Sequence, residues 1–258
     1  MNENSSNARV AVVTGAGRGI GAAIADRLER DGFRVVRLDV IAPEASASRA
    51  PHVIACDISD PGAVDAVAQH VAREYGAVSV LVNNAGAWSF CALEDVTPDD
   101  FARTLAINVS GTFHCTRAFG RSMLANGGGS IVNIVSIAAR AANPKVGAYS
   151  ASKAGVVALT QQTALEWGPR GVRANAVGPG FVPTPGTGTV YDDQAVRDVR
   201  AAAVPLRRLG EPDDVANVVS FLASDQAGYV NGQVIYVDGG FSEALMTLVP
   251  RPPGVPGP

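Results

Sequence analysis

Short runs of branched apolar residues alternate with amphipathic stretches along most of this chain. Residues 9–14 read RVAVVT and stop at a glycine cluster, after which Ile20, Ile24 and Leu28 recur at helical spacing. The first unit is therefore predicted to be a strand, a tight turn and a helix over 19–31. The same alternation predicts the later elements. Further strands are expected at 33–38, 53–56, 78–82, 130–135, 172–177 and 234–237, and further helices at 61–75, 98–125, 148–167 and 212–224.

The order of these elements predicts the architecture. Strands that alternate with helices form a parallel sheet covered on both faces, and near-continuous Val and Ile runs are typical of strands buried on both sides. Because crossover connections are right-handed, we expect a doubly wound sheet of about seven strands. We predict one α/β domain over residues 1–258, a length that this fold class reaches without splitting.

Some segments depart from the alternation. The connection between Asp39 and Asp57 is short and rich in Ala, Ser and Pro, so the helix expected there is predicted to be reduced to a loop. Residues 180–210 form a long connection with a Gly- and Pro-rich start, which predicts a mobile substrate lid. The polar leader 1–8 is expected to be flexible, and the Pro-rich tail 250–258 extended or disordered.

Composition and charge narrow the partners. The net charge of -3 and the absence of like-charge runs argue against binding to nucleic acid or an anionic membrane. The chain has no secretory signal and no apolar stretch of the roughly 18 residues that a membrane span needs. Its 3 cysteines, at unrelated spacings, fit a reducing compartment, and His114 lacks the neighbours of a metal ligand set. We expect a cytoplasmic protein with small-molecule partners and no metal.

The glycine cluster reads TGAGRGIG from Thr14 to Gly21 and joins the first predicted strand to the first predicted helix. Glycines at such a turn let the backbone approach a pyrophosphate, whose charge the helix N-terminus stabilises. Gly15 would make the turn, Gly19 the close approach and Gly21 the tight helix packing. The alternative is a turn that merely needs glycine. The context favours a dinucleotide cofactor.

Two residues bear on which dinucleotide is bound. Asp39 ends the second predicted strand, near the spacing at which an acid reaches the adenosine ribose hydroxyls. A carboxylate there would repel a 2′-phosphate by about 4 kcal/mol per charge pair at ~4 Å in a partly solvated site. Arg18 argues the other way, because a basic residue in the glycine loop can pair with that phosphate. We give Asp39 more weight and predict NAD, with NADP as the less favoured cofactor.

Lysine is rare in this chain, which uses arginine for most of its positive charge. Lys153 follows Tyr149 by four residues, so the two side chains would share one face of a helix. An ammonium that stabilises phenolate would lower the pKa of the phenol towards the working range, which suits Tyr149 to proton transfer. Ser136, at a strand end, would donate a hydrogen bond to a substrate oxygen. Lys145 is expected on the loop before the helix, as a solvated lysine, with contact at the pocket mouth as the alternative.

Taken in order, these residues resemble the short-chain dehydrogenase/reductase family, in its single-domain branch, and the match covers nearly the whole chain. The resemblance implies a Rossmann-type fold, a homotetramer with a homodimer as the alternative, and oxidation of alcohols or reduction of ketones with a nicotinamide cofactor. The residues that carry it, besides the glycine cluster, are Asp57, the NNAG of Asn83 to Gly86, Asn108, Ser136, Tyr149, Lys153 and the pair Pro179 and Gly180.

The resemblance also implies roles at the site. Lys153 would lower the pKa of Tyr149 and hydrogen-bond the nicotinamide ribose, and Asn108 would hold a water in a proton relay. Thr184 is similar to the residue that contacts the carboxamide, although prolines flank it here. Asp57 would approach the adenine, with local capping as the alternative. The predicted catalytic residues are Asn108, Ser136, Tyr149 and Lys153. The predicted cofactor contacts are Gly15, Arg18, Gly19, Ile20, Gly21, Asp39, Asp57, Ile58, Asn84, Ala85, Gly86, Tyr149, Lys153, Pro179, Gly180, Val182 and Thr184.

The expected substrate follows from the pocket walls of this fold, which here offer aromatic and aliphatic side chains and no cluster of arginines. We predict hydride transfer between NAD(H) and a neutral, fairly apolar secondary alcohol or ketone, with Tyr149 as acid and base. The alternatives are an NADPH-dependent carbonyl reductase, an epimerase or dehydratase, and a non-catalytic cofactor-binding protein. The predicted substrate-pocket residues are Trp88, Phe90, Ser136, Ile137, Phe181 and Tyr191.

Overall fold

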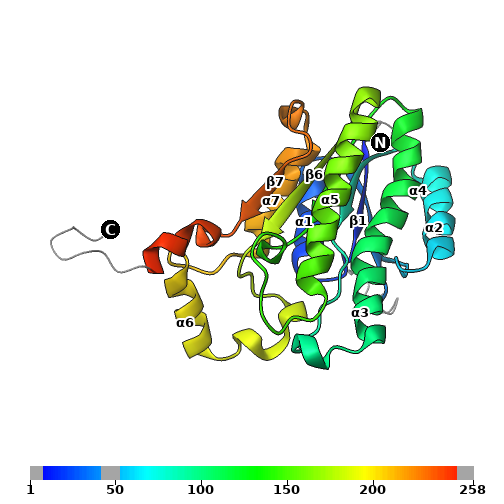
Figure 1. Cartoon of the computed structure of the whole chain (residues 1–258). Helices are drawn as coiled ribbons and strands as arrows, with labels where there is room; N and C mark the ends of the chain where they lie inside the picture. The colour runs from blue at the N-terminus through cyan, green and yellow to red at the C-terminus, as the bar shows by residue number, and fades with distance from the viewer. Residues whose placement is uncertain (1–7, 42–52, 249–258) are drawn as a thin grey trace, which may run out of the picture.

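The computed structural model describes residues 8–41 and 53–248, and it shows a central sheet with helices on both faces (Figure 1). Seven strands lie in the order β3-β2-β1-β4-β5-β6-β7, and every neighbouring pair is parallel. The predicted doubly wound α/β sheet is confirmed. The strands are β1 (Val10–Thr14), β2 (Arg34–Asp39), β3 (Val53–Ala55), β4 (Val78–Asn83), β5 (Gly129–Ile134), β6 (Val172–Pro179) and β7 (Val234–Val237).

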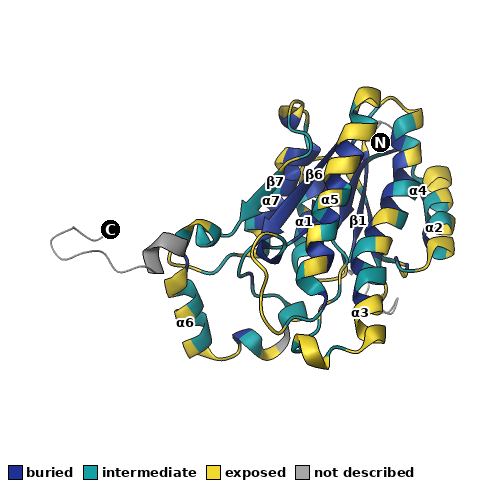
Figure 2. Cartoon of the chain, viewed as in Figure 1, coloured by how far each residue is buried: buried dark blue, intermediate teal, exposed yellow. Residues whose placement is uncertain are grey.

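Helices cover the two faces of this sheet because successive strand residues point to opposite sides. Val13 packs with Ile24 of α1 in one apolar cluster, whereas its neighbour Val12 packs with Val71 of α2 and Phe119 of α4 in the other. The central strands are mostly buried, the edge strands β3 and β7 are not, and the outward helix faces are exposed (Figure 2). The helices are α1 (Gly19–Arg30), α2 (Pro61–Glu74), α3 (Pro98–Leu105), α4 (Thr112–Ala125), α5 (Tyr149–Trp167), α6 (Gln194–Ala203) and α7 (Pro212–Ala223).

The strand order determines where a ligand can bind. β1 pairs with β2 on one side and with β4 on the other, so the chain winds outward in opposite directions from the junction of β1 and β4. The loops that follow β1 and β4 therefore diverge at the carboxyl edge of the sheet and leave a crevice between them. Both loops carry predicted cofactor residues.

The helix predicted over 98–125 is interrupted. α3 ends at Leu105, a π-helical segment covers Ala106–Gly111, and α4 begins at Thr112. Gly111 sits tightly against the chain after β3, where an added Cβ would lie 2.7 Å from the Ile58 side chain. Hydrophobic spacing cannot reveal such a widened turn, because one inserted residue hardly alters the pattern. π-helical turns of this kind are frequent at functional sites.

The predicted lid contains regular structure that its sequence did not suggest. A 3₁₀ helix covers Pro185–Tyr191, and α6 follows it. The Asp193 side chain caps α6 by accepting a hydrogen bond from the Ala195 amide at 2.8 Å. No residue of α6 is buried, although its apolar residues Val196 and Val199 recur at helical spacing. Its mobility stays a prediction.

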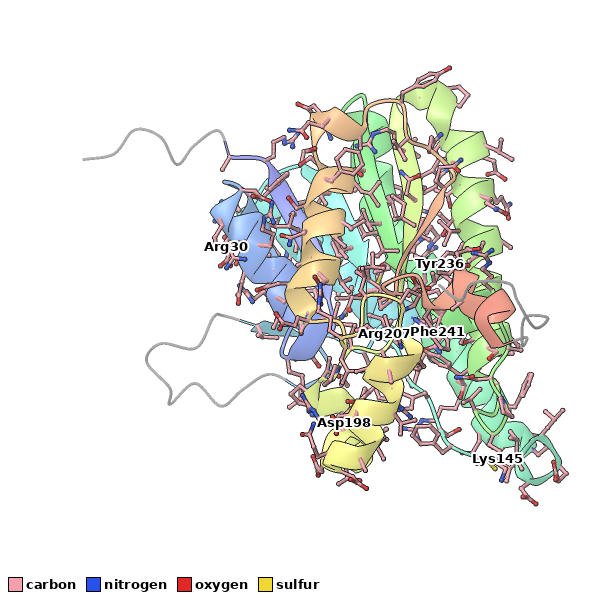
Figure 3. All side chains as sticks on the ribbon, turned by 90° about the vertical axis from the view of Figure 1, so that its left-hand side faces the viewer. Arg30, Lys145, Asp198, Arg207, Tyr236 and Phe241 are labelled. Carbon is pink, nitrogen blue, oxygen red and sulfur yellow. The ribbon has the colours of Figure 1, made fainter. Side chains whose placement is uncertain are left out.

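Several expectations fall on other parts of the chain. The reduced connection between Asp39 and Asp57 lies mostly outside the described residues, as do nearly all of the leader and the whole of the tail. Lys145 is on the loop before α5, as predicted, and it lies apart from α6 (Figure 3). Within residues 8–41 and 53–248, no helix is long and apolar enough to cross a membrane.

Candidate active site

A cleft of about 570 Å³ opens at the carboxyl edge of the sheet, between the loops after β1, β4, β5 and β6 and the lid. Every residue that the sequence predicted for cofactor or substrate contact lines it. Of the predicted catalytic residues, Ser136, Tyr149 and Lys153 also line the cleft, whereas Asn108 lies behind its wall. The fold thus brings together residues from seven separate parts of the sequence.

The glycine loop leaves no room for side chains. Gly15 has φ +63°, and a Cβ there would lie 2.8 Å from the Ala85 Cα. A Cβ on Gly21 would lie 2.0 Å from the Gly15 carbonyl oxygen, which explains why α1 can pack so closely under the turn. The Thr14 hydroxyl accepts hydrogen bonds from the amides of Asn84 and Ala85 at 3.0 and 3.1 Å, so the loops after β1 and β4 form one unit.

The N-terminus of α1 points into this bare loop. Its N-cap position is Arg18, no side chain caps the helix, and no acidic residue occurs in its first turn. The first amides of α1 are therefore available to an anion, and the helix dipole favours negative charge there. A glycine loop without room for side chains and an uncapped helix N-terminus fit the pyrophosphate of a dinucleotide.

Two acidic residues border the same end of the cleft. The Asp39 carboxylate accepts hydrogen bonds from the Gly17 amide at 2.9 Å and the Ile41 amide at 3.2 Å, which fixes it at the rim of the glycine loop. The Asp57 carboxylate accepts from the amide and the hydroxyl of Ser59 at 2.9 and 2.7 Å, and these bonds lower the pKa of Asp57. Asp57 therefore caps its own turn and also lines the cleft.

The catalytic candidates meet where β5 ends and α5 begins. Tyr149 is the first residue of α5, and its hydroxyl interacts with the side chain of Ser136, which follows β5. Lys153 lies one turn along on the same face, is buried, and donates a hydrogen bond from Nζ to the Ile134 carbonyl at 2.8 Å. The Ser136 hydroxyl also accepts from the Ala138 amide at 3.1 Å, which holds its side chain at the end of the strand.

Burial dominates the electrostatics of this pair. It raises the pKa of Tyr149 above its ordinary value, while the hydrogen bond with Ser136 acts in the opposite direction. Burial also lowers the pKa of Lys153 to about 8. The prediction that Lys153 lowers the pKa of Tyr149 is wrong for this structure, because Lys153 Nζ bonds to the Ile134 carbonyl and lies 5.8 Å from the centre of the tyrosine ring. The phenol is therefore protonated at neutral pH.

Asn108 occupies the π-helical segment and ties two parts of the site together. Its Oδ1 accepts from the Ala87 amide at 2.7 Å, and its Nδ2 donates to the Ala87 carbonyl and to the Ser152 hydroxyl, both at 2.8 Å. Ser152 in turn donates to the Tyr149 carbonyl at 2.7 Å. Asn108 thus fixes the loop after β4 against the first turn of α5. Its predicted water-holding role stays a prediction.

The other end of the cleft is walled by side chains from the lid and the loops. A Cβ on Gly186 would lie 3.1 Å from the Trp88 ring, so the lid packs against the loop after β4. The Phe181 ring meets the Phe241 ring edge-on, with centroids 4.7 Å apart. Tyr191 is buried beside them in the lid. This wall is mainly apolar, as the sequence predicted.

One charged residue of this wall was missed. Arg200, on α6, lines the cleft, with its guanidinium carbon 5.2 Å from the centre of the Phe181 ring and 4.8 Å from that of Tyr191. The sequence predicted no cluster of arginines in this wall, and a single arginine does not contradict that prediction. The Gly- and Pro-rich start of residues 180–210 predicts a loop, and a loop offers no helical face on which to place Arg200. The other lining residues that the sequence did not single out are Leu38, Val40, Cys56, Ala87, Arg103, Ile107, Ile134, Val135, Ala138, Asn143, Val146, Gly186, Thr187 and Val190.

The chain is similar in sequence to known oxidoreductases over almost its full length. The family described as enoyl-(acyl carrier protein) reductase matches residues 15–242. D-threitol dehydrogenase of Mycolicibacterium smegmatis is 41% identical over 242 residues, which cover 91% of this chain and 93% of that protein. The chain belongs to the short-chain dehydrogenase/reductase family. The 2-(R)-hydroxypropyl-CoM dehydrogenase of Xanthobacter autotrophicus is 38% identical over 246 residues, covering 91% of this chain and 98% of that protein.

Solved structures of short-chain dehydrogenases/reductases share the same fold. The gluconate 5-dehydrogenase of Burkholderia cenocepacia, solved with NADP and tartrate, has a TM-score of 0.86 and 32% sequence identity, and the match covers 92% of this chain and 96% of that one. The aldohexose dehydrogenase of Thermoplasma acidophilum has the same TM-score, with 33% identity and 98% coverage of both chains. These short-chain dehydrogenases/reductases carry different substrate names, so membership of the family establishes the chemistry of the site more firmly than its substrate. In the described parts of this chain, no group of three or more His, Cys, Asp or Glu side chains could hold a metal ion.

Proposed function

We propose that this protein interconverts a secondary alcohol and its ketone with NAD(H), and that Tyr149 exchanges the proton. The observation that carries this proposal is the contact of Tyr149 with Ser136, next to buried Lys153 and in the same cleft as a glycine loop fit for a dinucleotide. The nicotinamide ring, when bound, accepts a hydride from the carbinol carbon or returns it to the carbonyl carbon. The protein supplies the geometry and the proton.

In the reducing direction, the Tyr149 hydroxyl gives its proton to the carbonyl oxygen as negative charge develops there. The raised pKa of Tyr149 keeps that proton in place at neutral pH. Ser136 donates a second hydrogen bond to the same oxygen and stabilises its charge. In the oxidising direction Tyr149 must first lose its proton, and hydrogen bonding with Ser136 is the contact that favours this loss. Asn108 positions this helix turn against the loop after β4.

The matching test replaces the proton donor while keeping the ring. We expect Tyr149→Phe to reduce kcat by about 10²- to 10⁴-fold, the usual contribution of general acid–base catalysis. NADH absorbance over a panel of secondary alcohols and ketones measures the rate, and cofactor binding by fluorescence titration serves as the control for folding. Wild-type turnover by the variant would contradict the mechanism. NAD binding without turnover of any alcohol or ketone would indicate the non-catalytic alternative.

NAD is the proposed cofactor because the Asp39 carboxylate is held at the rim of the glycine loop by two backbone amides. A negative charge at that place repels the 2′-phosphate of NADP. The NADP-dependent alternative draws support from the NADP bound in the structure of the gluconate 5-dehydrogenase and from Arg18, which also lines the cleft.

The cofactor preference is tested with Asp39→Asn, which removes the charge and keeps an oxygen that can accept from the Gly17 amide. We expect the ratio of kcat/KM for NAD over NADP to fall by about 10- to 100-fold, mostly through improved use of NADP. Arg18→Ala is the matched variant, and it should move the ratio towards NAD. A wild-type enzyme that already prefers NADP would overturn the assignment.

The remaining proposals concern the whole chain. We propose that it works as one domain in the cytoplasm, with residues 180–210 as the substrate lid and with assembly to a homotetramer, or to a homodimer as the alternative. The resemblance to single-domain relatives and the free cysteines support this view. Size-exclusion chromatography with light scattering measures the assembly. The substrate is proposed to have an apolar body, held by Trp88, Ile137 and Phe181.

A further inference from the structure

Arg200 is the feature of the cleft that the proposed function does not use. It lies in the last turn of α6 and is partly buried, and its guanidinium stands against the rings of Phe181 and Tyr191. Contact with two aromatic rings restricts the long side chain before any ligand arrives. The guanidinium N–H groups, which lie in the plane of the group, can still face the cleft that Arg200 lines.

This guanidinium has no acidic partner within residues 8–41 and 53–248, where it makes neither an ion pair nor a hydrogen bond. Its neighbours behave differently. Arg208 pairs with Asp214, and Arg197 of the same helix donates to the Tyr191 carbonyl at 3.3 Å. The acid of α6 nearest in sequence, Asp198, accepts a hydrogen bond from Gln194 at 2.7 Å. A positive charge in a mainly apolar cleft is thus left without a counter-charge.

We propose that Arg200 binds a singly charged oxyanion on the substrate, so that the preferred substrate is a secondary alcohol with a carboxylate at its far end, or the matching oxo acid. The proposal rests on the proposed function and names its substrate class. A planar guanidinium binds a carboxylate through two parallel hydrogen bonds, which fixes both distance and orientation. Trp88 and Phe181 would cover the apolar segment between that carboxylate and the reacting carbon. A single arginine suits one negative charge better than the two of a phosphate.

The test compares acids with their esters. 4-Hydroxypentanoate and 5-hydroxyhexanoate are assayed with NAD beside their methyl esters, which lack the charge and keep the carbinol. We expect wild type to prefer one acid over its ester in kcat/KM. Arg200→Gln should lower kcat/KM for that acid by about 10- to 100-fold, through KM, and change the ester by less than about 2-fold. Raised salt should weaken the preference of the wild type.

Arg197→Gln is the matched control, because it removes a guanidinium from the same helix and a contact with the lid. It should affect the acid and its ester equally. Binding is measured separately by calorimetry of 5-oxohexanoate and its methyl ester with NADH-loaded Tyr149→Phe, with and without Arg200→Gln, so that no turnover is needed.

The outcomes separate this inference from the proposed function. If wild type shows no preference for the acids in either rate or binding, or if Arg200→Gln weakens acid and ester alike, the role of Arg200 is refuted while hydride transfer stands. If no alcohol or ketone is turned over but the oxo acid binds in an Arg200-dependent way, the proposed function fails and the anion site stands.

Discussion

The two ends of the cleft are built from different parts of the polypeptide. At the glycine-loop end, backbone atoms form the surface, and side chains are excluded at Gly15 and Gly21 because other backbone atoms occupy the space. At the lid end, the rings of Trp88 and Phe181 and the guanidinium of Arg200 form the surface. A backbone surface suits a ligand that recurs across many proteins, whereas a side-chain surface can change with the substrate.

Because of this difference, the two ends of the cleft should respond differently to substitutions. The loops after β1 and β4 are joined through Thr14 and Asn84, so a shift in one moves the other. The lid is a long connection that lines the cleft mainly with side chains. Replacing one of these side chains therefore leaves the backbone in place. We therefore expect changes at the glycine loop to act on cofactor binding, and changes at the lid to act on substrate choice.

The largest effect on cofactor binding is expected from Gly15→Ala. The new Cβ would lie 2.8 Å from the Ala85 Cα, and the residue would be held at φ +63°. Relief requires the two cofactor loops to separate, so Kd for NAD should rise by at least about 100-fold, close to 3 kcal/mol. Isothermal titration measures it. Gly32→Ala is the matched control, because Gly32 has φ +89° but nothing within 4 Å of the added Cβ. It should lower stability and leave Kd unchanged. Equal effects on Kd would refute the close-packing argument.

A second prediction concerns Lys153, which stands between the two ends. Its pKa falls from 10.5 in the unfolded chain to about 8 in the folded protein, so the unfolded state holds more protons between these values. The unfolding free energy of wild type should therefore rise with pH across this window. Below pH ~8, burial of the Lys153 ammonium lowers it by about 3 kcal/mol at most.

Lys153→Met removes that charge and keeps the stem. Urea unfolding is measured without cofactor and at fixed protein concentration. At pH 7 the variant should have a higher unfolding free energy than wild type. The loss of the hydrogen bond to the Ile134 carbonyl reduces this gain by about 1 kcal/mol. The difference should shrink at pH 9.5, although the variant is inactive at both. A difference that does not depend on pH would show that burial of the ammonium is not its cause.

The smallest effect is expected at Lys145, on the loop before α5. It has φ +59°, a left-handed conformation that costs a residue with a Cβ about 1 kcal/mol. Lys145→Gly relieves this cost, partly offset by the greater freedom of glycine in the unfolded chain, and should raise the unfolding free energy by about 0.5 kcal/mol. Arg207→Gly, at φ +57°, should do the same within the lid. A loss of stability in both variants would contradict the strain argument.

The sequence was most informative where local chemistry and local geometry coincide. The glycine loop, Asp39 at a strand end, and the pair Tyr149 and Lys153 could be recognised because each needs a given residue type at a given spacing. The strands were also predictable, since buried parallel strands read as continuous apolar runs. Helix α6 and Arg200 were not, because the Gly- and Pro-rich start of this segment predicts a loop and the direction of the helix relative to the cleft depends on distant contacts.

The pKa of Tyr149 shows the same limit. From spacing alone, Lys153 was expected to lower it, but helical spacing states only that two side chains share a face. Burial and the choice of the Ile134 carbonyl as the partner of Lys153 are properties of the packed structure, and here they reverse the expected direction. The role of Asn108 likewise depends on a π-helical turn that hydrophobic periodicity does not reveal.

By itself, the sequence determined the doubly wound sheet, the glycine loop that joins its first strand and helix, and the family to which the chain belongs. Only the tertiary structure decided how far each proton-bearing group is desolvated, what covers the lid end, and that a guanidinium without an acidic partner among the described residues faces the cleft there. The physical reason is the distance along the chain over which each kind of interaction acts. Turns, caps and periodic burial depend on neighbours along the chain, whereas desolvation and charge pairing depend on residues that only folding brings together.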